Sequence, residues 1–228
     1  MLEWQPSFEK YGFAIPAEGL TEAEVLKLVE DLSKLSTRQG KAGVRHVLEH
    51  PTVSALAQEQ RFLGIAQGIL GPEALPFRAT LFDKSPGRNW LIAWHQDTAL
   101  PLRERPEMPG WGPWSVKGGI IYAHAPASAL CRIIALRIHL DESSFRNGAL
   151  RVLPATHNLG VLIDDEIHRL STDIPEVTCA VARGGILAMR PLLIHSSSKS
   201  QINAPRRVLH IEYAASPIVD RGMRLAVA

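Results

Sequence analysis

Residues 206–213 have the sequence RRVLHIEY, in which polar and apolar side chains alternate. A second run, RIIALRIHL at 132–140, is mostly apolar. Comparable short runs follow one another from Phe77 onward, and turn residues such as Asn147-Gly148 and Gly184-Gly185 separate them. Short apolar runs with frequent turn signals predict many antiparallel strands in one sandwich or barrel. The sequence therefore predicts a mainly β fold.

The N-terminal third has a helical pattern instead. Thr21 is a candidate N-cap with Glu24 three residues later, and apolar residues then recur at helical spacing as far as Leu35. A second helix is expected from Pro51 to the residues before Gly71, because proline suits a first helical turn and glycine followed by proline ends a helix. We therefore expect helices ahead of the β core.

The composition is that of an ordinary globular chain. Of 228 residues, 46% are hydrophobic and 21% are charged, so we expect one domain, with a helical part at 1–75 and a β core at 76–216. The net charge of +2 is too small for the basic field that non-specific nucleic-acid binding needs. We expect neither a leader peptide nor a membrane span, since no suitable apolar stretch is present. Two isolated cysteines predict no disulfide and a reducing, cytoplasmic location.

The strongest local signal is Trp-His-Gln-Asp at 94–97, which ends an apolar run. Residues two apart in a strand point to the same face, so His95 and Asp97 can share a metal ion. The candidate third ligand is His195, at the end of another apolar run. Two histidines and one carboxylate on one side of a metal form the facial triad of non-haem Fe(II) oxygenases, which leaves positions open for a co-substrate and oxygen.

Arg206 strengthens the metal-site hypothesis. It lies eleven residues after His195, at the start of the alternating run. A guanidinium can bind a carboxylate through two parallel hydrogen bonds, which suits the far end of a dicarboxylate that chelates the metal at its other end. Each residue alone has a plainer interpretation, because His-x-Asp is common by chance and His195 could be an ordinary packed histidine. The combination is what indicates a site.

The chain resembles the phytanoyl-CoA dioxygenase family of Fe(II)- and 2-oxoglutarate-dependent oxygenases. Four segments carry the resemblance, in this order: WHQD at 94–97, NGALRVLPATH at 147–157, RPLLIHSSS at 190–198 and APRRVLHIEY at 204–213. It implies a double-stranded β-helix, the jelly-roll core of cupin-like proteins, behind N-terminal helices.

The resemblance also implies roles for individual residues. The family's iron ligands correspond here to His95, Asp97 and His195. Arg206 falls on the position that binds the distal carboxylate of 2-oxoglutarate, Lys84 resembles a second co-substrate contact, and Ser197 is a further candidate. The implied reaction uses O2 to hydroxylate a small-molecule substrate and decarboxylates 2-oxoglutarate to succinate.

Two departures from the family pattern leave the substrate open. The distal histidine is followed by Ser-Ser-Ser where members often have Gly-Ser-Gly, and residues 154–157 are Pro-Ala-Thr-His where many have Pro-Gly-Ser-His. Two alternative functions also stay open: a cupin-type metalloprotein that does not use 2-oxoglutarate, and a non-catalytic jelly-roll binding protein. The oligomeric state does not follow from the sequence.

Two further predictions concern a lid over the substrate and the direction in which the side chains of one strand point. Residues 98–117 form the longest irregular stretch and contain several prolines, so we expect a lid over the substrate that is not part of the barrel. Neighbouring strand residues point to opposite faces, and the family spacing selects Arg206, not Arg207, as the inward one. His210 and Glu212 would then point inward as well.

Overall fold

The computed structural model describes residues 3–35, 43–84 and 88–227, and its strands form three antiparallel sheets. The six-stranded sheet contains, in spatial order, β1 (Phe13–Ala14), β11 (Ile186–Met189), β8 (Ile133–His139), β13 (Arg206–Ala214), β3 (Leu75–Lys84) and β2 (Val44–Arg45). The four-stranded sheet contains β10 (Val177–Thr178), β9 (Leu150–Val152), β12 (His195–Ser197) and β4 (Ile92–His95). The three-stranded sheet contains β5 (Ala99–Leu102), β7 (Ile120–His124) and β6 (Trp114–Lys117).

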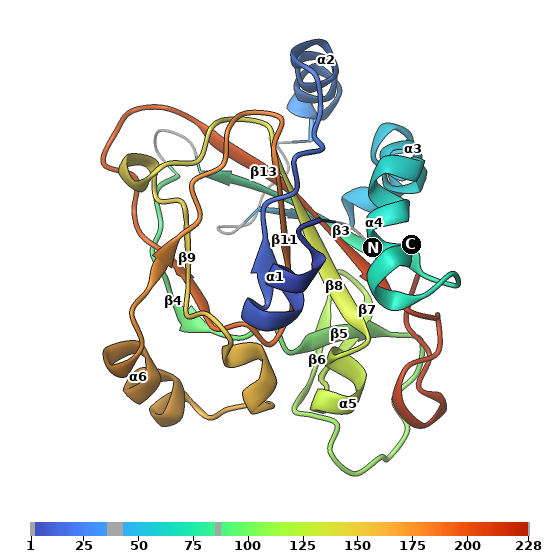
Figure 1. Cartoon of the computed structure of the whole chain (residues 1–228). Helices are drawn as coiled ribbons and strands as arrows, with labels where there is room; N and C mark the ends of the chain where they lie inside the picture. The colour runs from blue at the N-terminus through green and yellow to red at the C-terminus, as the bar shows by residue number, and fades with distance from the viewer. Residues whose placement is uncertain (1–2, 36–42, 85–87, 228) are drawn as a thin grey trace.

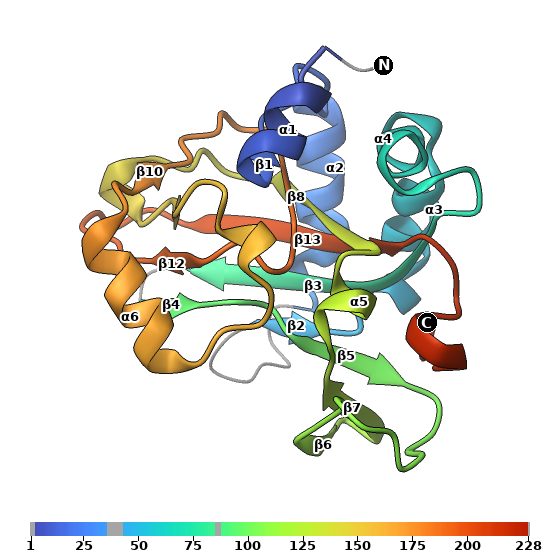
Figure 2. The same cartoon turned by 60° about the horizontal axis from the view of Figure 1, so that its bottom comes forward.

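The chain crosses repeatedly between the two larger sheets. The chain passes from β3 to β4, from β8 to β9, and then from β10 through β11 and β12 to β13. The layer that contains β12 and β4 lies against the layer that contains β13 and β3 (Figure 2). Strands that alternate in this way between facing antiparallel sheets form a double-stranded β-helix. The predicted mainly β jelly roll is therefore confirmed.

Apolar side chains fill the space between these sheets at the end away from β13. Leu150 and Val152 of β9 belong to one buried cluster with Leu187 and Met189 of β11. Burial of such side chains on both facing sheets is the main stabilising contribution to a β sandwich.

Helices cover the outer faces of both sheets. The six-stranded sheet is covered by α1 (Gln5–Tyr11), α2 (Glu22–Ser33), α3 (Pro51–Gln58) and α4 (Gln60–Leu70) (Figure 1). Val25 and Phe62 from these helices share a buried cluster with Leu209 of β13. On the four-stranded sheet, Ile167 of α6 (Asp164–Asp173) clusters with Ile194. The remaining short helices are α5 (Ala127–Leu130), η1 (Val47–Glu49), η2 (Phe145–Asn147), η3 (Thr156–Leu159) and η4 (Asp220–Gly222).

One helix prediction is confirmed and one is wrong. Thr21 caps α2 in a capping box with Glu24, as the sequence predicts. The single helix expected from Pro51 is instead two helices, because Glu59 has extended backbone angles (φ −61°, ψ 138°) between α3 and α4. Arg61 donates hydrogen bonds to the side chains of both Glu59 and Glu24, which stabilises the bend. Neither glycine nor proline marks this break, so the local sequence carries no signal for it.

The stretch 98–117 is not irregular throughout, and that expectation is wrong at both ends. β5 and β6 both pair with β7, so within this stretch only Thr98 and residues 103–113 lie outside strands. Pro101 lies inside β5 opposite Tyr122. Proline is tolerated there because β5 is an edge strand, in which a backbone N–H on the side away from β7 is not needed for pairing within the sheet. The role of 98–117 as a lid stays a prediction.

Neither the state of the cysteines nor the length of the helices indicates a disulfide or a membrane span in the described residues. Cys131 and Cys179 are both free, as expected, and burial raises the pKa of the Cys179 thiol to about 12, which makes it a poor nucleophile. No helix within the described ranges is long and apolar enough to cross a lipid bilayer.

Candidate functional site

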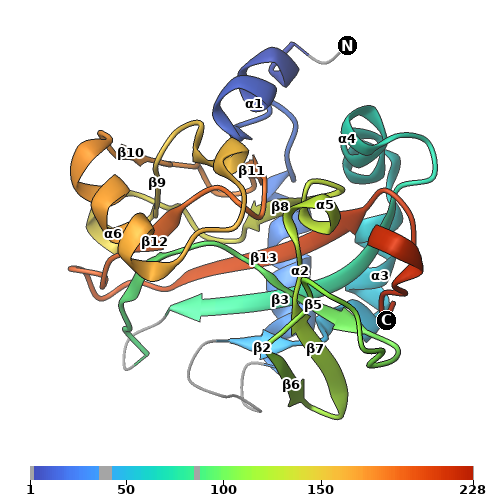
Figure 3. The ribbon, with the colours of Figure 1, turned by 90° about the horizontal axis from the view of Figure 1, so that it is seen from below.

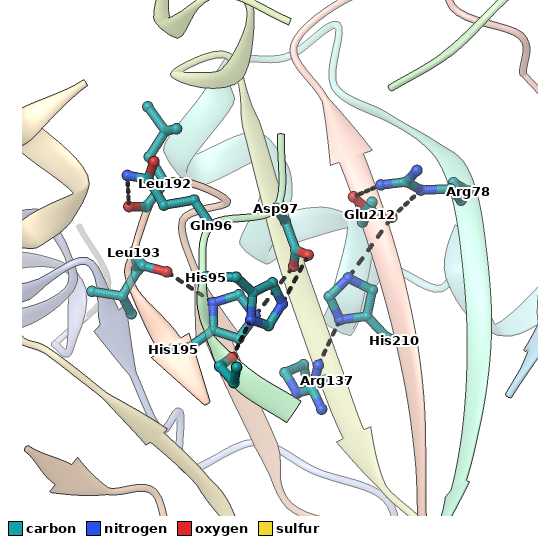
Figure 4. A network of polar contacts seen from close by, with 11 residues as sticks. Arg78, His95, Gln96, Asp97, Arg137, Leu192, Leu193, His195, His210 and Glu212 are labelled. Carbon is teal, nitrogen blue, oxygen red and sulfur yellow. Dashed lines mark hydrogen bonds and ion pairs between the residues drawn. The ribbon is translucent and has the colours of Figure 1, made fainter. Parts of the chain in front are cut away.

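Three potential metal ligands converge between the sheets (Figure 4). His95 ends β4, His195 begins β12, and the two residues are cross-strand partners. Nε2 of His95 lies 3.7 Å from Oδ1 of Asp97, and Nε2 of His195 lies 3.5 Å from Oδ2. One ligand atom from each residue lies within 4.8 Å of the other two. The structure thus brings together the three ligands that the sequence predicted.

Backbone carbonyl groups orient both imidazoles. Nδ1 of His95 lies 2.8 Å from the carbonyl oxygen of Ala93, and Nδ1 of His195 lies 2.8 Å from that of Leu193. When Nδ1–H donates to a carbonyl, the free lone pair is on Nε2, which is the ring atom nearest Asp97 in both cases. Two imidazole nitrogens and one carboxylate on one side suit Fe(II) with open positions. The residues therefore fit the metal that the family resemblance implies.

Gln96 anchors the segment between His95, at the end of β4, and Asp97 just beyond it. Its Nε2 donates to the carbonyl oxygen of Leu192 at 2.8 Å and to that of Gly160 at 2.9 Å. Its Oε1 accepts from the backbone N–H of Leu162 at 2.9 Å. Sequence reasoning missed this role, although strand alternation does predict that residue 96 points away from the ligands.

The protonation states also suit metal binding. Burial lowers the pKa of His195 to about 4, so its imidazole is neutral at pH 7 and free to act as a ligand. Burial alone would raise the pKa of Asp97, but His195, His95 and further cations outweigh it and hold that pKa below its usual value. The carboxylate is therefore ionised.

A second cluster lies beside this triad. Arg206 is only 3% exposed, and its Nη2 lies 3.3 Å from Oγ of Ser197. Lys84, which is the β3 partner of Arg206, donates to the same Oγ at 2.8 Å and to the carbonyl oxygen of Ser198 at 2.6 Å. The three residues that the family resemblance implies for 2-oxoglutarate thus lie together.

This cluster has more donors than acceptors. Nε and Nη1 of Arg206 are buried and have no hydrogen-bond partner among the residues that the structure describes. Burial, together with Arg137, lowers the pKa of Arg206 to about 10. Burial, followed by Arg206 and Arg137, lowers the pKa of Lys84 to about 7. Buried cations without a carboxylate partner are unfavourable, so the cluster fits an anionic ligand.

Gly148 is necessary for the close packing around Ser197. Its φ of +73° is in the left-handed region, and a Cβ there would lie 2.2 Å from the carbonyl oxygen of Ser198. The Gly148 carbonyl accepts a 2.8 Å hydrogen bond from Oγ of Ser197. The Asn147-Gly148 pair, predicted as a turn, therefore also supports the acceptors that Lys84 uses.

Arg207 points away from this cluster. Its Nε and Nη2 donate to the two carboxylate oxygens of Asp141, each at 2.8 Å. Arg206 thus faces the interior and Arg207 faces outward, in the order that the family spacing predicts.

A cavity of about 270 Å³ opens beside Asp97 and is also lined by Thr80, Phe82, Thr98, Lys117 and His124. The inward side chains of His210 and Glu212 line it too. Arg78 forms a buried ion pair with Glu212 and donates to the carbonyl oxygen of Ala99 at 2.9 Å. The cavity wall is thus polar on the β13 side, and the charges of Arg78 and Glu212 there are paired with each other.

Sequence reasoning missed two charged residues on the inner face. Arg78 and Arg137 each stand among apolar neighbours in a strand, and this interruption was the available signal. Their partners lie on other strands, so the sequence could not indicate whether either charge was paired.

Several solved structures share this fold. EctD from S. alaskensis in its apoform superposes with a TM-score of 0.74 at 16% identity, covering 97% of this chain and 80% of that chain. AviO1 from Streptomyces viridochromogenes Tue57 gives 0.67 at 20% identity, covering 97% and 99%. HygX from Streptomyces hygroscopicus, with nickel and 2-oxoglutarate bound, gives 0.66 at 13% identity, covering 94% and 87%. Likeness at these identities establishes the fold alone.

Sequence comparison establishes the family. No curated protein sequence matches the chain. The family model described as Phytanoyl-CoA dioxygenase (PhyH) does match, over residues 8–208. The matched range contains the metal triad and Arg206, and it also includes the N-terminal helices from Phe8 onward. The chain therefore belongs to the phytanoyl-CoA dioxygenase family.

Proposed function

We propose that this chain is a non-haem Fe(II)- and 2-oxoglutarate-dependent dioxygenase that hydroxylates a small molecule. The observation that carries the proposal is a triad of two histidines and one carboxylate beside the buried guanidinium of Arg206, whose Nε and Nη1 have no hydrogen-bond partner among the described residues. Membership of the family supports it. Proteins of the same fold have been solved with bound Fe, in EctD, and with nickel and 2-oxoglutarate, in HygX.

In this proposal His95, Asp97 and His195 hold one face of the metal. When bound, Fe(II) together with 2-oxoglutarate and O2 supplies the oxidising chemistry that couples decarboxylation of 2-oxoglutarate to hydroxylation of a C–H bond. The neutral imidazole of His195 and the ionised carboxylate of Asp97 are in the protonation states that metal binding needs. The hydrogen bonds to the carbonyl groups of Ala93 and Leu193 keep both Nε2 atoms directed at the metal.

Arg206 anchors the distal carboxylate of 2-oxoglutarate in this proposal. Its Nε and Nη1 are the free donors, while Lys84 adds a second positive charge and Ser197 a hydroxyl group. Lys84 is 1% exposed and Arg206 is 3% exposed, so water competes little for the same donors. Exclusion of water also protects the reaction from side products.

The cavity beside Asp97 is the proposed substrate site. It combines the ring of Phe82 with polar groups such as His124 and Lys117. A volume of about 270 Å³ suits a small molecule, since ligand sites start near this size. The cavity is continuous with the metal triad because Asp97 belongs to both.

Calorimetry with a redox-inert metal tests the proposal. We expect one Zn²⁺ or Ni²⁺ per chain, and 2-oxoglutarate binding to the metal-loaded protein. Asp97→Ala should lose the metal, and Arg206→Met should lose 2-oxoglutarate while it keeps the metal. Metal binding without 2-oxoglutarate binding would support the cupin-type alternative. Binding of neither would support a non-catalytic jelly-roll protein.

A further inference from the structure

Arg137 lies near the centre of the six-stranded sheet. It belongs to β8 and pairs with Leu187 of β11 on one side and with His210 of β13 on the other. Its side chain points between the sheets, beside the metal triad (Figure 4). Only 6% of the residue is exposed. Arginine stays charged in proteins, so its charge needs compensation in this position.

The protein itself compensates this charge incompletely. Nη1 of Arg137 donates to Nδ1 of His210 at 3.1 Å, and the guanidinium lies 5.4 Å from the ring centroid of Phe82. Burial holds the pKa of His210 well below its usual value, so the imidazole is neutral and brings no negative charge. Within the described part of the chain, Nε of Arg137 is buried and has no hydrogen-bond partner. The neighbouring carboxylate of Glu212 is already paired with Arg78.

A comparison with other arginines of the chain shows that burial without an ion pair is unusual. Arg137 and Arg206 are the two arginines that are less than a tenth exposed in the described chain, and neither forms an ion pair with a described carboxylate. Arg190 and Arg207 are more exposed, and each is paired with an acidic side chain. The most deeply buried positive charges are thus the ones left without negative partners.

The position of Arg137 indicates which ligand it meets. Arg137 lies beside the metal triad (Figure 4), and its cross-strand partner His210 belongs to β13, the strand that begins with Arg206. Arg137 does not line the cavity that we assign to the substrate. A ligand that extends from the metal to Arg206 therefore passes Arg137, whereas a substrate in the cavity is separated from it by Phe82 and His210.

We propose that Arg137 binds the carboxylate of 2-oxoglutarate nearest the metal, while Arg206 binds the distal carboxylate. This inference rests on the proposed co-substrate and adds a second residue that recognises it. Two buried guanidinium groups that form no ion pair with a described carboxylate then meet the two carboxylates of one dicarboxylate. Each such contact is a charge-assisted hydrogen bond, and the free Nε of Arg137 is one of the donors.

Calorimetry on the Zn²⁺-loaded protein with two ligands tests the proposal. 2-Oxoglutarate has both carboxylates, whereas 2-oxopentanoate keeps the chain length, the keto group and the carboxylate nearest the metal but lacks the distal one. Arg137→Met should weaken both ligands by a similar factor of at least about tenfold. Arg206→Met should weaken 2-oxoglutarate by a comparable factor and leave 2-oxopentanoate within about twofold of wild type.

Three outcomes would overturn the proposal. Wild-type affinity for both ligands in Arg137→Met would remove Arg137 from co-substrate binding. Loss confined to 2-oxoglutarate would assign Arg137 to the distal carboxylate. Full recovery in Arg137→Lys would indicate long-range attraction only, because an ammonium group keeps the charge but lacks the planar fork. Failure of the proposed function is distinguishable, since wild-type protein would then bind no 2-oxoglutarate at all.

Thermal unfolding without ligands separates binding from a structural role. Arg137→Met removes an unpaired buried charge, so the ligand-free variant should melt at or above the wild-type temperature. A lower melting temperature together with unchanged affinity would assign Arg137 to stability and contradict the proposal. Arg207→Met is the matched control, since it removes an outward guanidinium and should leave both affinities unchanged.

Discussion

The two faces of β13 place neighbouring arginines in opposite situations. Arg207, on the outer face, donates to both oxygens of Asp141, and a quarter of its side chain is exposed. Arg206, on the inner face, is 3% exposed and has two free donors. A partly exposed pair contributes modestly to stability, whereas a buried unpaired charge lowers stability unless a ligand compensates it. The missing partner, more than the arginine itself, marks the binding face.

The two faces also differ along the rest of the sheet. Figure 3 shows β13 and β3 side by side, with α2 and α3 behind them. Leu209 and Ile211 of β13 and Leu81 of β3 face the helices and form part of the apolar core. Their neighbours in sequence, such as His210, face the cavity. One strand thus contributes to the apolar core on one face and lines the cavity on the other.

The largest expected effect comes from breaking the proposed metal triad, which the inner face of β13 opposes across the space between the sheets. His195→Ala should weaken metal binding by at least about 100-fold, since loss of a direct ligand should exceed the loss of an outer-shell partner. The fold should persist, because the ligand contributes little apolar packing. Metal titration and circular dichroism measure the two effects, with His168→Ala on exposed α6 as the control. Wild-type metal affinity in His195→Ala would show that the triad is wrongly assigned.

The next largest effect is expected at Arg206, the inward one of the two neighbouring arginines. Arg206→Ala should weaken 2-oxoglutarate binding by at least tenfold, because truncation of one partner of a buried charged pair costs about 2 to 5 kcal/mol. Metal affinity should be unchanged. Arg206→Lys should recover only part of the affinity, since it keeps the charge without the planar fork. Calorimetry on the metal-loaded protein measures all three quantities, and complete recovery in Arg206→Lys would contradict a bidentate contact.

A smaller effect concerns Lys84 and pH. The pKa of Lys84 is about 7 in the folded protein but about 10.4 in an unfolded chain, so between these values the unfolded state binds more protons. The stability of the ligand-free protein should therefore rise with pH across this window, and thermal melts should show the rise in wild type more than in Lys84→Met.

The same residue predicts proton uptake on binding. A carboxylate near Lys84 favours its charged form, so 2-oxoglutarate binding at pH 8 should take up protons. Calorimetry in two buffers of different ionisation enthalpy measures the uptake, and Lys84→Met should reduce it. Equal uptake in the variant and in wild type would remove Lys84 from the co-substrate site.

The smallest effect belongs to the outer face. Arg207→Ala should leave 2-oxoglutarate affinity unchanged and lower the free energy of unfolding by about 1 kcal/mol, as measured in urea, because a partly exposed bidentate pair is lost. If Arg207→Ala weakened binding and Arg206→Ala did not, the register of β13 would be shifted by one residue. The inward positions of His210 and Glu212 would then be wrong too.

Part of the site follows from short stretches of sequence. His95 and Asp97 share a face because side chains two residues apart in an extended segment point the same way. The same alternation places the adjacent residues Arg206 and Arg207 on opposite faces. Thr21 and Glu24 form a capping box that needs only one helical turn. These features depend on local geometry, so the sequence alone predicts them.

Other features were decided only by the tertiary structure. Arg78 meets Glu212 across 134 residues of chain, and Arg137 meets His210 across 73. β5 is a strand despite Pro101 because β7 supplies its hydrogen-bond partners. Which charges are paired and which are left for a ligand depends on the register between distant strands, and packing of the whole core sets that register.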